Sequence, residues 1–306
     1  MILPSPRWLP LLRELGDLKR VRSAGKKGSL AERLFVQSWR RLVAGEEINS
    51  VSRDITARAL VATRLGDLDG ATLLSAGLKE AAVDQVLARA LEAAAAPCET
   101  AAMTWLRGAA RGLRLDAEAD PGAAVPTPGF VFRLANQPRA GATAPGQQRV
   151  MFDPTENHAE HCLCVAVAAV LLAQEGGAEP GQVFLASLSH HLHNALLADS
   201  GFAGEMMLGE WLGTAMEGAT KLALGELRPE LSQRVANACR ILPDAETPGG
   251  RVFHAADTLD RVLQMEHHLR AADTSMAFLQ HDMGLMHEGP VKPFQDALLR
   301  EMGLAA

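Results

Sequence analysis

Apolar residues recur at intervals of three and four between Ser29 and about Ala95, which is the spacing of one face of an α-helix. In the segment SLAERLFVQSWRRLVAG, 29–45, this spacing is kept by Leu30, Leu34, Trp39 and Leu42. Ser29 and Glu32 form the S-x-x-E pattern of a capping box before the run, and Gly45 follows it as a stop signal. The pattern predicts a small helical bundle at the N-terminal end of the chain.

The helical spacing breaks in residues 115–148, LDAEADPGAAVPTPGFVFRLANQPRAGATAPGQQ, where proline and glycine recur throughout. Such punctuation is typical of a linker, and the run FVFRL, 130–134, predicts one short strand within it. Helical spacing returns from Glu156. We therefore expect an N-terminal helical domain at 1–114, a linker at 115–148 and a second helical domain at 149–306.

Composition supports helices rather than sheets. At 306 residues the chain is longer than a typical single domain, which agrees with two domains. It has no tyrosine and only 4% aromatic residues, so the core must rest on leucine, alanine, valine and methionine. Strands depend on aromatic and β-branched residues, whereas leucine and alanine favour helices. The expected fold class is all-α.

Charge is unevenly distributed along the chain. The net charge is −6, yet residues 1–53 hold eleven Lys/Arg against five Asp/Glu. A basic head of this kind can contact nucleic acid or anionic lipid. A solvated N-terminal surface is the simpler interpretation, and we expect neither a nucleic acid nor a membrane as a partner.

The cysteines and the apolar runs predict a cytoplasmic protein. Four cysteines show no C-x-x-C spacing, and Cys162 and Cys164 lie inside an apolar run, which favours a reducing compartment. The first residues, MILPSPRWLPLLRELG, carry proline and arginine where a signal peptide needs an unbroken apolar stretch. The longest apolar run, CLCVAVAAVLLA at 162–173, is shorter than a bilayer span.

All ten histidines lie between His158 and His287, so the candidate chemistry belongs to the second half of the chain. Three segments carry the pattern in order: ENHAEHCLCVAVAAVLLA at 156–173, ASLSHHLHNALLADSGF at 186–202, and GGRVFHAADTLDRVLQMEHHL at 249–269. A histidine before an apolar helix, a histidine pair ending another and an aspartate on a later helix form a distributed set of metal ligands.

In this order the three segments resemble the HD-domain metal-dependent phosphohydrolase superfamily, most closely its 5′-deoxynucleotidase-like branch. The matching residues are Glu156, Glu160, His161, Val165 and Ala166 in the first segment, His190, Leu192, Ala195 and Asp199 in the second, and Ala256, Asp257, Leu259 and Asp260 in the third. The resemblance implies an HD-domain-like helical domain that holds a metal ion through His161, His190, His191 and Asp257, and it suggests a homo-oligomer.

Two positions depart from the family pattern. His191 replaces the aspartate of the family's His-Asp pair, and Asn194 replaces a glutamate that assists attack by water in this branch. Three imidazoles and one carboxylate favour a single divalent transition metal, with Zn, Fe, Co or Ni preferred over Mg or Mn. Asn194 cannot accept a proton near neutral pH, so hydrolysis requires another base.

Neighbouring residues supply the remaining expected roles. His193 has a suitable intrinsic pKa for proton transfer, and the resemblance places Asp199 where it would orient water or substrate. Arg149 stands loosely where the family keeps a basic residue for phosphate. Glu160 and Asp260 are expected to orient the imidazoles. His158 is expected at the surface, although it is close enough to His161 to be an additional ligand.

Three functions remain open on the sequence alone. The leading hypothesis is metal-dependent hydrolysis of a phosphate ester, with a nucleotide or related small phosphorylated molecule as substrate. The alternative is a catalytically impaired HD domain that serves as a ligand-binding or interaction module. The third is an iron-dependent oxygenase of the HD type. The dipeptide His281-Asp282 repeats the superfamily's name but belongs, on this interpretation, to a terminal helix.

Overall fold

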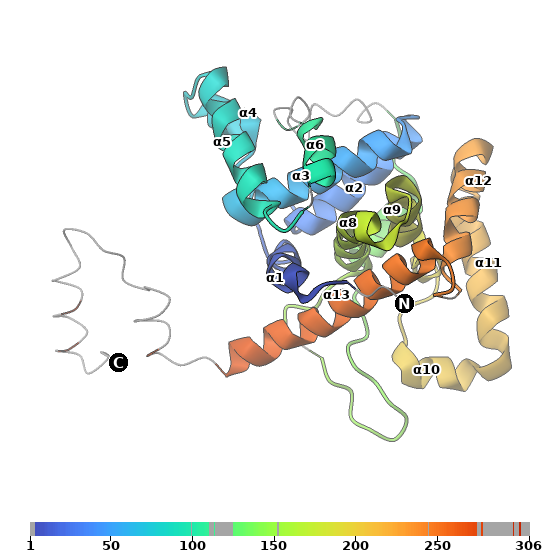
Figure 1. Ribbon diagram of the computed structural model, residues 1–306. Coiled ribbons are helices and arrows are strands. Elements are labelled where there is room, and N and C mark those ends of the chain that lie inside the picture. Colours follow the sequence, from blue (N-terminus) through green and yellow to red (C-terminus); the bar gives the residue numbers. More distant parts are fainter. Residues whose placement is uncertain are drawn as a thin grey trace. The chain divides into compact units, whose positions relative to one another are not determined.

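The computed structural model describes residues 4–98, 100–109, 113, 125–151, 153–243 and 245–273, together with 277, 296 and 300. Across these residues the chain forms helices and no named strand, and the only β-type pairs are isolated bridges (Figure 1). The expected all-α class is confirmed. His281 and Asp282 lie outside the described residues.

The helices before residue 150 are η1 Pro6–Trp8, α1 Leu9–Asp17, α2 Leu30–Val43, α3 Ile48–Leu65, α4 Gly70–Ser75, α5 Glu80–Ala94, α6 Thr100–Arg107 and α7 Gly129–Asn136. Those after it are α8 His158–Gly176, α9 Pro180–Ser189, η5 Leu192–Ala195, α10 Gly201–Leu208, η6 Gly209–Trp211, α11 Leu212–Leu224, α12 Pro229–Ala238, η7 Cys239–Ile241 and α13 Pro248–Ala272.

Helix α2 forms as its sequence pattern predicts. The Ser29 hydroxyl accepts a hydrogen bond from the Glu32 amide at 3.1 Å and satisfies one free donor of the first turn. Beyond the helix, Gly45 has a φ of +95°, which glycine adopts without a steric cost. The apolar residues spaced at three and four are all buried: Leu30, Leu34, Trp39 and Leu42.

The short strand expected at 130–134 is instead a helix, α7. Its buried residues Phe130, Val131 and Leu134 are spaced as on one helical face. The Phe130 ring packs edge-on against the Trp39 ring of α2, with centroids 4.8 Å apart. Packing against the core therefore overrides the strand preference of this aromatic and β-branched run.

Helix α8 is the centre of the core. Every residue from His158 to Ala173 is buried, and the helix packs against α2, α3, α7 and α9 (Figure 1). It is long and apolar enough to cross a membrane by length and composition, but 83% of its apolar window is buried within the protein. The same properties belong to the core helix of a globular domain.

The chain divides into two compact units at a position other than the linker expected at 115–148. Residues 1–263 form one compact unit and residues 264–306 form another. Helices α2 and α3, from before the expected linker, share the core of the first unit with α7 and α8. The N-terminal helices therefore contribute directly to the surroundings of the histidine-bearing helix.

Candidate metal centre

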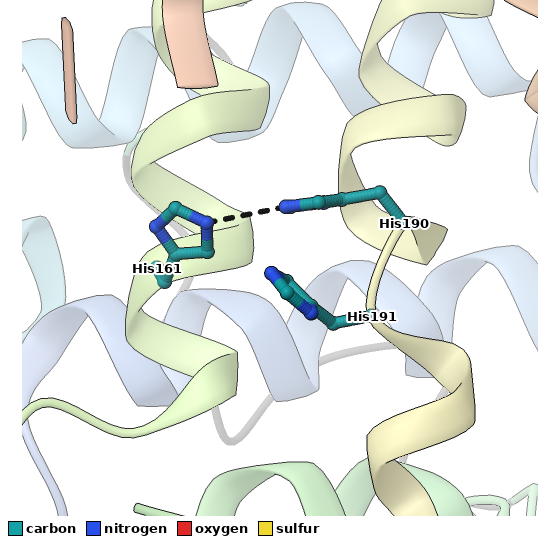
Figure 2. A group of neighbouring side chains, drawn as sticks. All are labelled: His161, His190 and His191. Carbon is teal, nitrogen blue, oxygen red and sulfur yellow. Dashed lines mark hydrogen bonds between the residues drawn. The ribbon is translucent and has the colours of Figure 1, made fainter. Parts of the chain in front are cut away.

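Three histidines converge between α8 and the end of α9. His161 lies in the first turns of α8, whose start is fixed by a capping box between Asn157 and Glu160. His190 is the C-cap of α9, and His191 is the first residue outside that helix and precedes η5. Figure 2 shows the three rings turned toward one another across the gap between the two elements.

The distances among these rings are those of a ligand cluster. The Nε2 atoms of His161 and His190 are 3.2 Å apart, and ring nitrogens of all three histidines lie within 4.8 Å of one another. Asp257 of α13 adds a carboxylate oxygen 3.2 Å from His161 Nε2 and 3.8 Å from His190 Nε2. The structure thus brings the three histidines together and places Asp257, the fourth residue proposed from the sequence, beside two of them.

The Nδ1 atom of each of the three histidine rings lies within hydrogen-bond distance of an oxygen atom. His161 Nδ1 lies 2.7 Å from a carboxylate oxygen of Asp260, and His190 Nδ1 lies 2.6 Å from the Ser187 carbonyl oxygen. His191 Nδ1 lies 2.8 Å from the Asn194 amide oxygen. Each partner is an acceptor, so Nδ1 is a donor in each ring. The Nε2 atom of His191 is an acceptor, because Arg139 donates to it, whereas the Nε2 atom of His161 also faces a carboxylate oxygen, that of Asp257.

The Nε2 atoms of His161 and His190 face one another inside the protein. Two acceptor nitrogens at 3.2 Å, beside a carboxylate oxygen, repel each other unless a proton or a cation lies between them. Burial lowers the pKa of His190 to about 3, so its ring is neutral at pH 7. Neutral imidazoles with a carboxylate are the ligand set of Zn and related transition metals, so this centre can hold a metal ion.

Asp257 is ionised despite its partial burial. Burial opposes its charge, but the hydrogen bond with His161 and the nearby basic groups hold the pKa of the carboxyl well below its usual range. Its second oxygen accepts a hydrogen bond from Arg261 at 2.8 Å. The centre therefore contains one fixed negative charge at neutral pH.

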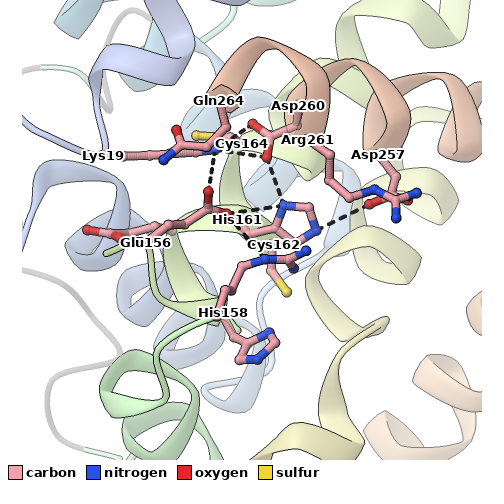
Figure 3. Close-up of polar contacts among 12 residues, drawn as sticks. Lys19, Glu156, His158, His161, Cys162, Cys164, Asp257, Asp260, Arg261 and Gln264 are labelled. Carbon is pink, nitrogen blue, oxygen red and sulfur yellow. Dashed lines mark hydrogen bonds and ion pairs between the residues drawn. The ribbon is translucent and has the colours of Figure 1, made fainter. Parts of the chain in front are cut away.

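A second acidic group lies on the opposite side of His161. Glu156, His161 and Asp260 have ligand atoms close enough for a metal, but the Lys19 ammonium already lies there (Figure 3). Both Asp260 oxygens accept from Lys19 Nζ at 2.8 Å, and Glu156 lies 3.4 Å from it. Burial opposes the charge of Lys19, yet the two carboxylates hold its pKa above the usual value. This group is an ion-paired support for His161.

Asp260 has the role expected from the sequence, and Glu160 does not. Asp260 accepts the His161 Nδ1 proton and so orients the imidazole. Glu160 instead accepts from the Asn157 amide at 2.9 Å and completes the capping box of α8. Its position one residue before His161 in a helix directs it away from the imidazole.

Arg139 is a member of the centre that the sequence analysis missed. Its Nη1 donates to His191 Nε2 at 3.0 Å, and its Nε lies 3.8 Å from Glu156. A guanidinium thus contacts the lone pair that a metal would use. Arg133 and Arg139 are the only charged residues within 125–148, and that isolation was the available signal.

Arg149, expected to bind phosphate, lies elsewhere. Its side chain is exposed, and its Nη atoms donate at 3.4 Å to the carbonyl oxygens of Ala140 and Ser200. These contacts connect two loop segments rather than reaching the three histidines.

Asp199 and His193 flank the centre. The two Asp199 oxygens accept from the amides of Gly201 and Ala140, each at 2.9 Å, so the carboxylate anchors the loop after η5. His193 is half-buried, with its ring centroid 5.5 Å from that of His191. Burial lowers its pKa, with Asp199 acting in the opposite direction. Both residues are near the centre, and neither belongs to a group of ligand atoms close enough together for a metal ion among the described residues.

His158 is buried, contrary to the expected surface position. It is 0% exposed, and its ring centroid lies 4.6 Å from that of His191. Neither ring nitrogen has a hydrogen bond within the described part of the chain, although Asp199 lies 3.5 Å from Nε2. Burial lowers its pKa to about 2, so the ring is neutral. An unbonded imidazole at this depth is a free polar group beside the centre.

No family model matches this chain, and comparison with curated proteins and with solved structures also finds no match.

Proposed function

We propose that the centre binds one divalent transition metal ion and that the protein hydrolyses a small phosphate ester. The observation that carries this proposal is the convergence of ring nitrogens of His161, His190 and His191, with a carboxylate oxygen of Asp257 beside the first two. An ion held by these residues supplies Lewis acidity toward a phosphoryl oxygen and lowers the pKa of bound water. The donor set favours Zn, Fe, Co or Ni over Mg or Mn.

Arg139 is the residue best placed to hold the substrate's phosphate. Its guanidinium donates to His191 Nε2 in the present arrangement, and it would exchange this contact for an anionic oxygen when His191 binds an ion. Arginine suits that role because its planar donors match phosphate oxygens. Arg149, with its donors on two carbonyl groups, is the weaker candidate.

Water would be positioned by the residues beside His191. His158 has two unbonded ring nitrogens at that side of the centre, and Asp199 lies 3.5 Å from one of them. We assign to this pair the orientation of a water molecule. His193 remains a second candidate for proton transfer. Asn194 fixes the His191 tautomer and has no proton to exchange.

The resemblance to HD-domain phosphohydrolases remains part of this proposal. It is supported by the chain order of the converging ligands, from α8 through the end of α9 to α13. We also propose a cytoplasmic location and a homo-oligomer. The four cysteines are free, which suits a reducing compartment.

The first test is metal content, measured by mass spectrometry on protein purified without a histidine tag. We expect about one transition metal ion per chain in the wild type and almost none in His161→Ala. His193→Ala is the matched control, because it removes a nearby histidine outside the cluster and should retain the ion. Metal-free wild type after reconstitution with zinc or iron would contradict the proposal.

The second test is release of phosphate by the metal-loaded protein from nucleoside monophosphates and p-nitrophenyl phosphate. Turnover that disappears in His161→Ala supports hydrolysis. The alternative is a non-catalytic binding module. The observation in its favour is Asn194, whose amide oxygen accepts a hydrogen bond from His191 Nδ1. If the wild type binds metal without turnover and Asn194→Glu gains turnover, the module is the better description.

The oxygenase hypothesis requires a second metal ion. The nearest further group, Glu156, His161 and Asp260, already surrounds the Lys19 ammonium. We therefore expect one ion per chain, and two irons per chain would favour oxygen chemistry instead.

A further inference from the structure

The Nε2 lone pair of His191 is already used by a neighbouring arginine. Arg139 Nη1 donates a hydrogen bond to His191 Nε2 at 3.0 Å. His191 Nδ1 donates to the Asn194 amide oxygen at 2.8 Å, so the ring is in the tautomer whose Nε2 carries one lone pair. This single lone pair can be given either to the guanidinium or to a metal ion.

The guanidinium and a metal ion exclude each other at this atom. Transition metal ions bind an imidazole nitrogen at about 2.0–2.1 Å, which is inside the 3.0 Å that separates Arg139 Nη1 from His191 Nε2. Two positive charges at such a separation repel strongly in a partly buried site. The metal can therefore gain His191 as a ligand only after the Arg139 side chain has moved.

The Arg139 side chain has few other contacts to hold it in place. Its Nε lies 3.8 Å from one oxygen of Glu156, whose other oxygen lies 3.4 Å from the Lys19 ammonium. The Arg139 backbone is anchored separately, because its amide donates to the Glu156 carbonyl oxygen at 2.9 Å. The side chain is 20% exposed, so it can rotate toward solvent while its backbone stays in place.

A guanidinium that has left His191 requires a new acceptor. Its planar N–H donors match the oxygens of a phosphate group, and charge-assisted hydrogen bonds of this kind are among the strong ones. A metal ion at His191 and an oxyanion on Arg139 thus favour the same arrangement, in which the Arg139–His191 hydrogen bond is broken.

We propose that Arg139 competes with the metal ion for His191 and that an oxyanion bound to Arg139 raises the metal affinity. The inference rests on the proposed function, because it concerns the ion and the phosphate of that same site. Each ligand binding alone must break the Arg139–His191 hydrogen bond, whereas the two together break it once. The coupling is reciprocal, so the metal raises the affinity for the oxyanion by the same factor.

The competition is tested by the zinc affinity of the full-length protein, measured against a chelator in the absence of phosphate. Arg139→Gln should bind zinc about tenfold more tightly than the wild type, because a hydrogen bond from a charged donor no longer has to be broken. In a His191→Ala background the same substitution should have no effect, because no Nε2 lone pair is released. Arg64→Gln, which removes a guanidinium paired with Glu14, is the control and should leave the affinity unchanged.

The outcomes separate this inference from the proposed metal site. An equal gain in both backgrounds would show a general effect of charge, and no gain in either would show that Arg139 does not compete. Both results would overturn the inference and leave the metal site standing. Absence of zinc binding in the wild type and in all the variants would contradict the proposed function, and the inference with it.

The coupling is tested by repeating the chelator competition with inorganic phosphate, and with chloride at equal ionic strength as the control. Phosphate should raise the zinc affinity of the wild type by about tenfold and that of Arg139→Gln by less than about twofold. Phosphate that binds the ion without Arg139 would raise the affinity of both proteins equally, and this result would overturn the coupling.

Discussion

The two ring nitrogens of His161 face groups of similar residues that differ in charge. The group at Nδ1 contains a lysine ammonium, and the group at Nε2 consists of histidine nitrogens and a carboxylate. On the Nδ1 side, Asp260 and Glu156 surround the ammonium of Lys19, which is 3% exposed. On the Nε2 side, the Nε2 atoms of His161 and His190 lie 3.2 Å apart, and a carboxylate oxygen of Asp257 lies 3.2 and 3.8 Å from them. Both groups have the spacing of metal ligands.

The difference between the sides is whether a cation lies among the acceptors that face His161. Lys19 satisfies the carboxylates on the Nδ1 side, so that side is a structural ion-pair group. On the Nε2 side, Arg139 donates to His191 and Arg261 donates to the second oxygen of Asp257, so both guanidiniums lie at the edge of the group. A candidate metal centre is therefore better identified by buried acceptors that lack a donor than by ligand-type residues alone.

The largest expected effect on stability comes from removing the Lys19 ammonium from the Nδ1 side. Lys19→Met leaves Asp260 and Glu156 buried without their partner, and we expect a loss of about 3–5 kcal/mol in the free energy of unfolding. Urea denaturation followed by circular dichroism measures the loss. Lys27→Met removes an exposed lysine and should change stability by less than about 0.5 kcal/mol. A similar small effect for Lys19→Met would mean that the buried ion pair has no structural role.

The next test weakens the link between the two sides. Asp260→Asn removes the charged acceptor of His161 while leaving all four proposed ligands, so metal affinity should fall by about 10- to 100-fold. Competition with a chelator of known affinity measures the change. Asp17→Asn, at an exposed position, is the control and should leave the affinity unchanged. Unchanged affinity in Asp260→Asn would separate the Nδ1 side from metal binding.

A third test frees a ring on the Nε2 side. Asn194→Ala removes the acceptor that holds the His191 proton on Nδ1, so the ring can present either nitrogen, and metal affinity should fall by roughly tenfold. The same chelator competition applies, with the exposed Asn136→Ala as control. If Asn194→Ala binds metal as the wild type does, His191 is not a ligand that depends on its tautomer.

A decrease in pH should affect the stability contributions of the buried histidines and of Asp260 in different pH ranges, because their pKa values differ. Burial holds the pKa of His190 at about 3 and that of His158 at about 2, below the unfolded value of 6.5. The unfolded chain therefore binds more protons between these values, so stability is fully present above pH 6.5 and is lost as pH falls toward 3. Asp260, with a pKa of about 2, loses its contribution only below about pH 4.

The measurement is the melting temperature of metal-free protein in chelator at pH 7.5 and pH 5.0. We expect a decrease of roughly 5 °C, because the histidines of the unfolded chain take up protons in this interval while the buried rings stay neutral. A melting temperature independent of pH over this range would show that the rings are solvated and not held neutral by burial.

The smallest expected effect concerns the arginine predicted from sequence. Arg149→Gln should change the affinity of the metal-loaded protein for inorganic phosphate by less than about twofold, whereas Arg139→Gln should weaken it by roughly tenfold. Calorimetric titration of phosphate into both variants gives the comparison. A larger loss of phosphate affinity in Arg149→Gln than in Arg139→Gln would mean that Arg149 binds the phosphate, as expected from the sequence.

The sequence predicted helices such as α2 because these depend on local spacing, and it proposed the candidate ligands through a resemblance in the order of three segments. The three-and-four pattern of α2 and the order of His161, His190, His191 and Asp257 can be read along the chain. It did not predict α7, because Phe130 and Val131 favour strands in isolation and become helical through contact with Trp39. Local preference failed where a distant aromatic ring determined the packing.

The partners of the centre escaped prediction because they are distant in sequence. Arg139 and His191 are 52 residues apart, and Lys19 and Asp260 are 241 apart. No spacing rule relates such pairs. His158 was expected at the surface, but α8 is buried on every side from His158 to Ala173, so its sequence has no polar face that would separate surface from core positions.

The pairing of Lys19 with Asp260 also bears on protein synthesis. The ribosome makes the chain from its N-terminal end, so Lys19 and His161 emerge long before the α13 residues that complete their surroundings. During most of translation the Lys19 ammonium lacks Asp260, and the histidines lack Asp257. The candidate centre is therefore completed only after residue 260 has been made, so the metal binding proposed for it would be a late step in the production of each molecule.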